Sequence, residues 1–137
     1  MSGKDMASNR LLPDTCAWID FFRGSQTPLA NAMEQALLNG EVMTCGVVLL
    51  ELLQGIKNPR EEELVKNALL ALPHLEMTRE LWLKAGKLSS LLRSKGQILP
   101  LSDIIIAATA LEFRCAVLTV DRHFEIVDGL TVLDELT

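Results

Sequence analysis

Short β-prone runs alternate with helical segments along this chain, and this alternation constrains the fold more than any other feature. The clearest strand covers residues 116–120, Ala-Val-Leu-Thr-Val, and it follows a strongly apolar helical segment at 104–113. Strands that are separated by helices are typical of an α/β domain with a largely parallel sheet. Further short strands are predicted at residues 11–12, 42–45 and 130–133, and residues 75–77 are interpreted as a brief extended link.

Residues that start or stop helices mark the ends of the remaining segments. Thr27-Pro28 opens a helix that ends at Asn39-Gly40, and Asn58-Pro59 is expected to end the helix after the second strand. Ser102 is expected to cap the apolar helix. Helices are predicted at residues 17–22, 46–56, 61–72, 81–92 and 104–113.

The length and composition indicate one globular domain. The chain has 137 residues, of which 49% are hydrophobic and 23% are charged, enough for a self-supporting core. Residues 1–10 are interpreted as a flexible leader and residues 11–137 as a single domain. The three cysteines form no CxxC pair, which favours a reducing cytoplasm over a disulfide scaffold or a zinc finger. No apolar run is long enough for a membrane span, so no membrane partner is expected.

The net charge of −5 argues against nucleic-acid binding through a broad basic surface. The chain has 13 Lys and Arg residues against 18 Asp and Glu residues, and aromatic residues make up only 4% of it. A base-stacking platform of the kind that binds single strands is therefore not expected. The net charge does not say where the carboxylates lie, and their placement is the informative feature of the sequence.

Four acidic residues occupy positions that need an explanation. Asp14 and Asp121 follow predicted strands, and parallel sheets present ligand sites at the carboxyl ends of their strands. Glu51 interrupts an apolar helical run, and Asp103 lies in the first turn of the apolar helix. Each also has a structural interpretation: Asp14 as a helix N-cap, Glu51 as a solvent-facing residue, Asp103 as an acid that the helix dipole stabilises, and Asp121 as a turn residue.

The joint placement of these four acids indicates a metal site. In a parallel sheet the four positions can converge at one edge, where the carboxylates would repel one another strongly. A hard divalent cation such as Mg²⁺ or Mn²⁺ relieves that repulsion through oxygen ligands. Such a site suits hydrolysis at phosphorus, because the metal activates a bound water and offsets the charge on the phosphate.

Four sequence segments carry these acids. They are Leu-Leu-Pro-Asp-Thr-Cys-Ala-Trp-Ile at 11–19, Leu-Glu-Leu-Leu-Gln-Gly at 50–55, Leu-Pro-Leu-Ser-Asp-Ile-Ile-Ile-Ala-Ala-Thr-Ala at 99–110, and Leu-Thr-Val-Asp-Arg-His-Phe at 118–124. Together they resemble the PIN domain and, more narrowly, the VapC toxins of bacterial VapBC toxin–antitoxin pairs. The resemblance covers nearly the whole chain, from about residue 11 to residue 136.

The resemblance implies a PIN-like α/β/α sandwich, with a short, mostly parallel central sheet flanked by helices, and a Mg²⁺- or Mn²⁺-dependent endoribonuclease. It assigns Asp14, Glu51, Asp103 and Asp121 as the catalytic acidic quartet. Asp14 and Asp103 match the positions most consistently tied to the metal, whereas Asp121 would support the metal and Glu51 would ligate through water or orient the nucleophile. The resemblance also implies an RNA substrate, a VapB-type antitoxin and a toxin homodimer.

Residues next to the quartet carry further expectations. Thr15 and Thr119 match hydroxyl positions that usually brace the acids. Arg122 is a candidate RNA contact because a guanidinium fork matches phosphate geometry, whereas Arg93 is better explained by its place at a helix C-terminus. Pro13 has no N–H for a sheet hydrogen bond, so the first strand is expected to end before it.

Two other functions fit the same residues. A catalytically silent PIN-like module would bind RNA or protein without cleaving anything, and a metal-dependent phosphatase would act on small phosphate esters. His123 could contact a phosphate or serve as a general acid, but a single histidine in a turn is more often a surface or packing residue.

Overall fold

The computed structural model describes residues 10–136, which form six α-helices, one 3₁₀ helix and five short strands. Residues 1–9, most of the predicted leader, lie outside the described part of the chain. No helix within residues 10–136 is long and apolar enough to cross a membrane. In chain order the elements are β1 (Leu11–Pro13), α2 (Thr15–Phe22), α3 (Pro28–Leu38), β2 (Thr44–Cys45), α4 (Gly46–Gln54), α5 (Pro59–Leu70), β3 (His74–Leu75), α6 (Arg79–Ser94), α7 (Leu101–Phe113), β4 (Ala116–Leu118), η1 (Arg122–Ile126) and β5 (Val132–Leu133).

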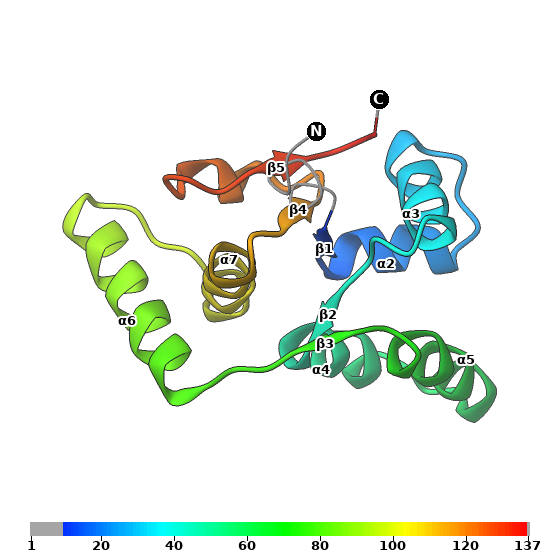
Figure 1. Ribbon diagram of the computed structural model, residues 1–137. Helices are drawn as coiled ribbons and strands as arrows, with labels where there is room; N and C mark the ends of the chain where they lie inside the picture. The colour runs from blue at the N-terminus through cyan, green and yellow to red at the C-terminus, as the bar shows by residue number, and fades with distance from the viewer. Residues whose placement is uncertain (1–9, 137) are drawn as a thin grey trace.

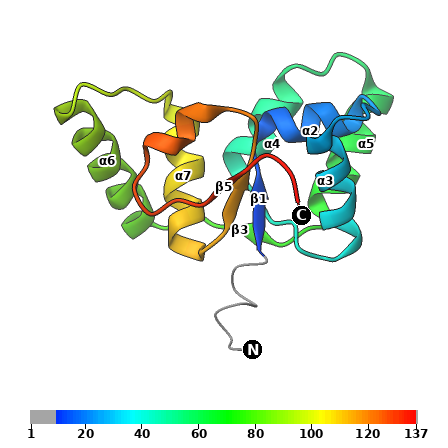
Figure 2. The same ribbon diagram turned by 90° about the horizontal axis from the view of Figure 1, so that it is seen from above.

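The five strands are parallel and follow the order β3-β2-β1-β4-β5. β1 pairs with β4 and β4 pairs with β5, with Leu12 opposite Val117 and Val117 opposite Val132. β2 pairs with β3, and a bridge between Leu11 and Val42 joins this pair to β1. Figure 1 shows α6 and α7 on one side of the strands and α2 and α3 on the other, and Figure 2 shows the same arrangement from above. The predicted α/β fold with a short parallel sheet is confirmed.

Two local predictions about helix ends are wrong. Asn58 and Pro59 begin α5 instead of ending α4, because Asn58 Oδ1 accepts a hydrogen bond from the Arg60 N–H at 2.8 Å and Pro59 takes the first helical position. α7 begins before Ser102, so Ser102 lies in the first turn and does not cap the helix. The extended link predicted at residues 75–77 starts in the paired strand β3 at Leu75 and continues as a non-helical connection to α6.

Pro13 belongs to β1, contrary to the prediction that the strand ends before it. Hydrogen bonds alternate along β1: Leu11 bonds toward β2, whereas the Asp14 N–H donates to the Leu118 carbonyl of β4 at 3.1 Å. Pro13 shares the side of Leu11, where the pairing with β2 has already ended. The missing N–H of Pro13 therefore breaks no sheet hydrogen bond, and Asp14 leaves the strand in register with β4.

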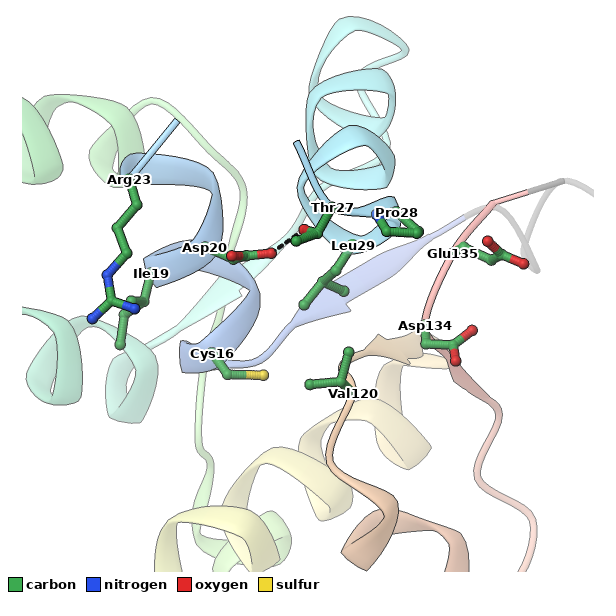
Figure 3. A pocket seen from close by; sticks show the side chains of 10 residues that line it. All are labelled: Cys16, Ile19, Asp20, Arg23, Thr27, Pro28, Leu29, Val120, Asp134 and Glu135. Carbon is green, nitrogen blue, oxygen red and sulfur yellow. Dashed lines mark hydrogen bonds between the residues drawn. The ribbon is translucent and has the colours of Figure 1, made fainter. Parts of the chain in front are cut away.

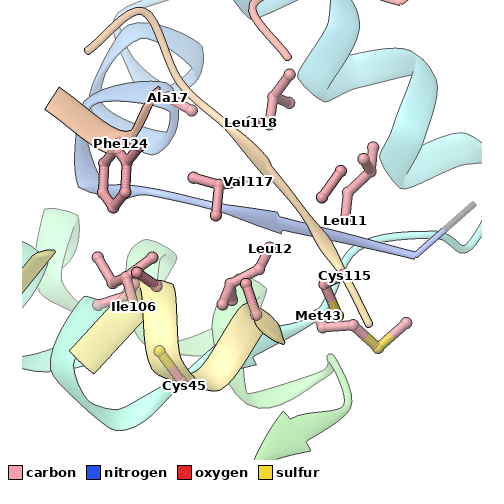
Figure 4. Close-up of a cluster of buried hydrophobic side chains, with 14 of the residues drawn as sticks. Leu11, Leu12, Ala17, Met43, Cys45, Ile106, Cys115, Val117, Leu118 and Phe124 are labelled. Atoms are coloured by element: carbon pink, nitrogen blue, oxygen red, sulfur yellow. The ribbon is translucent and has the colours of Figure 1, made fainter. Parts of the chain in front are cut away.

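The elements that carry the acids are anchored in the apolar core. Leu12, Val117 and Leu118 of the central strands are fully buried, as expected for a parallel sheet covered on both faces. Ile106 of α7 and Phe124 of η1 belong to the same cluster, which Figure 4 shows. The strand ends and the start of α7 are therefore held in place by close packing.

Candidate metal centre

The four predicted acids lie at or near the carboxyl edge of the sheet. Asp14 follows β1 directly, Asp121 lies just beyond β4, Asp103 lies in the first turn of α7, and Glu51 lies on α4. Ligand atoms of Asp103, Asp121 and His123 come within 4.8 Å of one another. Asp14 and Glu51 lie outside this group of three, but their charges contribute to a raised pKa at Asp103. The four acids therefore share one electrostatic environment.

Asp14 is buried, and both of its carboxylate oxygens are hydrogen-bonded. Oδ1 accepts from the Ala17 N–H at 3.1 Å and from the Cys16 thiol at 2.9 Å, and Oδ2 accepts from the Thr119 hydroxyl at 2.5 Å. The bond from Ala17 makes Asp14 the N-cap of α2, so its structural interpretation holds. Burial raises the pKa of Asp14, and the three donors oppose that rise.

Two threonine hydroxyls brace the acids. The Thr15 hydroxyl donates to Glu51 Oε1 at 2.6 Å, which joins the start of α2 to α4. The buried Thr119 hydroxyl donates to Asp14 and accepts from the Asp121 N–H at 2.9 Å. One hydroxyl thus couples the residues that follow two neighbouring strands.

Cys16 is a contact that sequence reasoning missed. Its half-buried thiol donates to Asp14 and lies 3.5 Å from Thr119 Oγ1. Burial, together with the hydrogen bond and charge of Asp14, raises the pKa of Cys16 to about 11, so the thiol stays protonated at neutral pH. The available signal was position: the second helical residue lies near the carboxylate of an N-cap acid.

Asp103, Asp121 and His123 form the open side of the acidic cluster. Asp121 Oδ1 accepts from the His123 N–H at 2.9 Å and lies 3.0 Å from His123 Nδ1. Burial raises the pKa of Asp103 to about 6, with the charges of Asp121, Asp14 and Glu51 adding to the shift. Within residues 10–136, no Lys or Arg side chain forms an ion pair with any of the four acids.

This donor set fits a hard divalent cation. The carboxylates of Asp103 and Asp121 supply the oxygen ligands that Mg²⁺ and Mn²⁺ prefer. The imidazole of His123 is a softer ligand and favours Mn²⁺ over Mg²⁺. Because no Lys or Arg side chain within residues 10–136 pairs with the acids, a bound cation would relieve their mutual repulsion.

Arg122 lies next to the cluster, but its guanidinium contacts an acid outside the cluster. Arg122 Nη1 lies 3.5 Å from Glu125 Oε1, and the Arg122 side chain is 82% exposed. Arg122 also lines a small hollow with Asp121 and Asp134. An RNA phosphate at Arg122 would therefore compete with Glu125.

Comparisons with known proteins support the fold described above. The DNA-bound VapBC complex from Salmonella typhimurium contains a chain with a TM-score of 0.76 and 21% identity, over 90% of this chain and 96% of that one. A chain of the VapBC2 complex from Rickettsia felis, bound to a promoter DNA fragment, has a TM-score of 0.75 and 20% identity. The match covers 89% of this chain and 96% of that one. A chain of a toxin–antitoxin complex from Klebsiella pneumoniae has a TM-score of 0.68 and 25% identity, over 92% of this chain and 99% of that one.

No curated protein sequence matches the chain significantly. The PIN domain family matches residues 11–130, which run from β1 to just before β5 and include all four acids. Because this match covers most of the sequence, the chain belongs to the PIN domain family.

Proposed function

We propose that this protein is a Mg²⁺- or Mn²⁺-dependent endoribonuclease of the VapC toxin type, neutralised by a VapB-type antitoxin. The observation that supports this most directly is the gathering of Asp14, Glu51, Asp103 and Asp121 near one sheet edge, without an ion-pair partner from Lys or Arg within residues 10–136. A divalent cation in such a site supports the hydrolysis of a phosphodiester.

The proposed role of each acid follows from how it is held. A bound Mg²⁺ or Mn²⁺ would activate water and offset charge on the phosphate. Asp103 and Asp121, on the open side, would hold the ion. A carboxylate has about four acceptor sites, and Asp14 already uses three of them, so it is suited to one further contact in a fixed direction. Glu51, restrained by Thr15, would orient a water molecule.

An antitoxin partner is supported by the solved structures with this fold, which are themselves toxin–antitoxin complexes. An acidic cluster is best blocked by a cation, so we expect an Arg or Lys of the antitoxin to enter it and displace the metal. A structure of the complex that retains the metal and leaves the cluster free of antitoxin cations would contradict this. We expect the activity in the cytoplasm, because an RNA substrate and a VapB-type antitoxin would both be present there.

A homodimer is supported by the apolar residues that α6 and α7 leave exposed. Trp82, Leu83, Leu91 and Leu101 are between 52% and 73% exposed. Because α6 and α7 pack together, we take these side chains as the candidate dimer interface. Sedimentation of the wild type and of a Leu83→Glu variant tests this, since only the wild type should form dimers.

RNA cleavage by the purified protein tests the proposed activity. With Mn²⁺, the wild type should cut fluorescent RNA into products with a 5′-phosphate and a 3′-hydroxyl, and EDTA or Asp103→Asn should abolish the reaction. Asp128→Asn is the matched control, because Asp128 is an exposed acid paired with Lys95 and lies outside the cluster. RNA binding without cleavage would favour the silent module, and release of phosphate from small esters alone would favour the phosphatase.

A further inference from the structure

Two hollows flank α2 and share Ile19 of the helix and Arg23 at its C-cap. The larger, of about 640 Å³, is lined by Cys16 at the start of α2 and by Val120 after β4. The smaller, of about 360 Å³, opens toward α4 and is lined by Glu51. Ile19 and Arg23 line both hollows. They therefore form a ridge between the hollows, which we call the Ile19–Arg23 ridge.

The Ile19–Arg23 ridge continues a stripe of side chains that starts in the candidate metal centre. Thr15, Ile19 and Arg23 are spaced four residues apart and so lie on one face of the helix. Thr15, at the start of the stripe, donates to Glu51. Arg23 lies about 12 Å further along the helix axis by helical rise, and Figure 3 shows its side chain running alongside Ile19. An extended RNA strand that crosses the metal centre can therefore follow this stripe to Arg23.

Arg23 carries an available positive charge on this stripe. Its side chain is exposed, and it forms no ion pair with any residue between 10 and 136. Asp20, which also lines the larger hollow, accepts a hydrogen bond from the Thr27 hydroxyl. Arg122, on the other side of the cluster, is paired with Glu125. In the described part of the chain, Arg23 is the only Lys or Arg that lines either hollow, and the other charged residues of the two linings are acidic: Asp20, Glu51, Glu61, Asp134 and Glu135. A phosphate in these hollows therefore has Arg23 as its one cationic partner within residues 10–136.

We infer that Arg23 binds an RNA phosphate neighbouring the scissile one, with the flanking nucleotides lying in the two hollows on either side of the Ile19–Arg23 ridge. This inference rests on the proposed function and adds to it a path for the RNA strand. Arg23 forms no ion pair with any of the four acids, so we assign it to binding and not to the chemical step. Ile19, which is 38% exposed, offers an apolar surface to a base or sugar.

The test measures RNA binding as a function of salt. Fluorescence anisotropy with a short single-stranded RNA of mixed sequence is recorded for Asp103→Asn, which should bind RNA without cleaving it. Adding Arg23→Ala should weaken binding about tenfold and reduce the slope of log affinity against log salt by about 0.7, the value for one phosphate contact on a single strand. Adding Arg23→Lys should restore most of the slope, because the positive charge is retained.

Arg93→Ala is the matched control, because Arg93 is an exposed arginine in the last turn of α6, away from both hollows. It should leave affinity and slope unchanged. An unchanged slope in Arg23→Ala overturns the inference, as does weaker binding of the antitoxin with unchanged binding of RNA. RNA binding that depends on Arg23, without cleavage by the wild type in Mn²⁺, would instead overturn the proposed function and leave the RNA contact standing.

Discussion

Asp14 and Asp103 belong to the same acidic cluster, but the protein holds them in opposite ways. Asp14 is 6% exposed and accepts hydrogen bonds from a backbone N–H, a thiol and a hydroxyl. Asp103 is more open and receives no hydrogen bond from a side chain within residues 10–136, while three other acids raise its pKa. Burial raises both pKa values, but only at Asp14 do donors oppose the rise.

This difference separates two tasks within one site. The side that contains Asp14 and Thr119 is fixed by the fold, because its bonds also cap α2 and join the ends of β1 and β4. The side that contains Asp103 and Asp121 has only His123 as a basic neighbour and no Lys or Arg partner within residues 10–136, so it gains most from a cation. We therefore expect substitutions on the Asp14 side to lower the free energy of unfolding. Substitutions on the Asp103 side should raise it when no metal is bound.

The largest expected effect is stabilisation by metal. At a Mn²⁺ concentration one hundred times the dissociation constant, binding to the folded state alone adds about 2.7 kcal/mol to the free energy of unfolding. Asp103→Asn should gain much less, because an amide is a weaker, uncharged ligand. Thermal melts with Mn²⁺ and with EDTA measure both values. Equal gains in the two proteins would show that Asp103 does not hold the ion.

The next largest effect is the loss of stability caused by Thr119→Val. The side chain keeps its volume, but a buried carboxylate oxygen of Asp14 and the N–H of Asp121 both lose a partner, at a cost of about 2 kcal/mol in the free energy of unfolding. The affinity for Mn²⁺ should fall by roughly 10- to 100-fold. Thr119→Ser keeps the hydroxyl and should lose only about 0.8 kcal/mol, the value of one buried methyl group. Urea unfolding and calorimetry check both variants.

The fold and the position of the acids could be predicted because both depend on local sequence. Apolar runs such as 106–110 and 116–118 are buried, and acids that follow parallel strands meet at one edge. β3 could not be predicted, because a two-residue strand has no periodicity and exists only through its pairing with β2. Pro13 was misjudged because its tolerance depends on which neighbour its nitrogen faces.

The contacts of single side chains were harder to predict from sequence. Cys16 and Arg23 gave no signal by type, because a lone cysteine and an exposed arginine are common anywhere in a chain. Their significance comes from position: Cys16 lies against Asp14, and Arg23 shares one face of α2 with Thr15. Thr15 and Thr119 were found only through family resemblance, since a threonine that braces an acid is identical in sequence to one that does not.

A smaller effect of opposite sign is expected for Asp103→Asn in the absence of metal. The substitution removes one of four like charges, so the variant should be more stable than the wild type by about 1 kcal/mol, after a discount for the partial exposure of Asp103 to solvent. Urea unfolding in EDTA measures this. Asp128→Asn, which removes an exposed charge outside the cluster, should show no gain. A less stable Asp103→Asn variant would show that the acid serves mainly to stabilise the start of α7.

The pH dependence of that gain is the smallest effect and the most specific. In the folded protein the pKa of Asp103 is raised from 3.8 to about 6, so folding disfavours the charged form. The wild type therefore loses stability as the pH rises from 3.8 to about 6, and above that range the loss is complete. The asparagine does not titrate, so its advantage should be absent below pH 3.8 and full above about pH 6.

Titrating groups outside the acidic cluster are common to both proteins and cancel in the difference between their unfolding curves. An advantage of Asp103→Asn that is constant with pH would place its cause in packing or helix propensity instead of charge. The contrast between the two sides of the cluster would then rest on the donors of Asp14 alone.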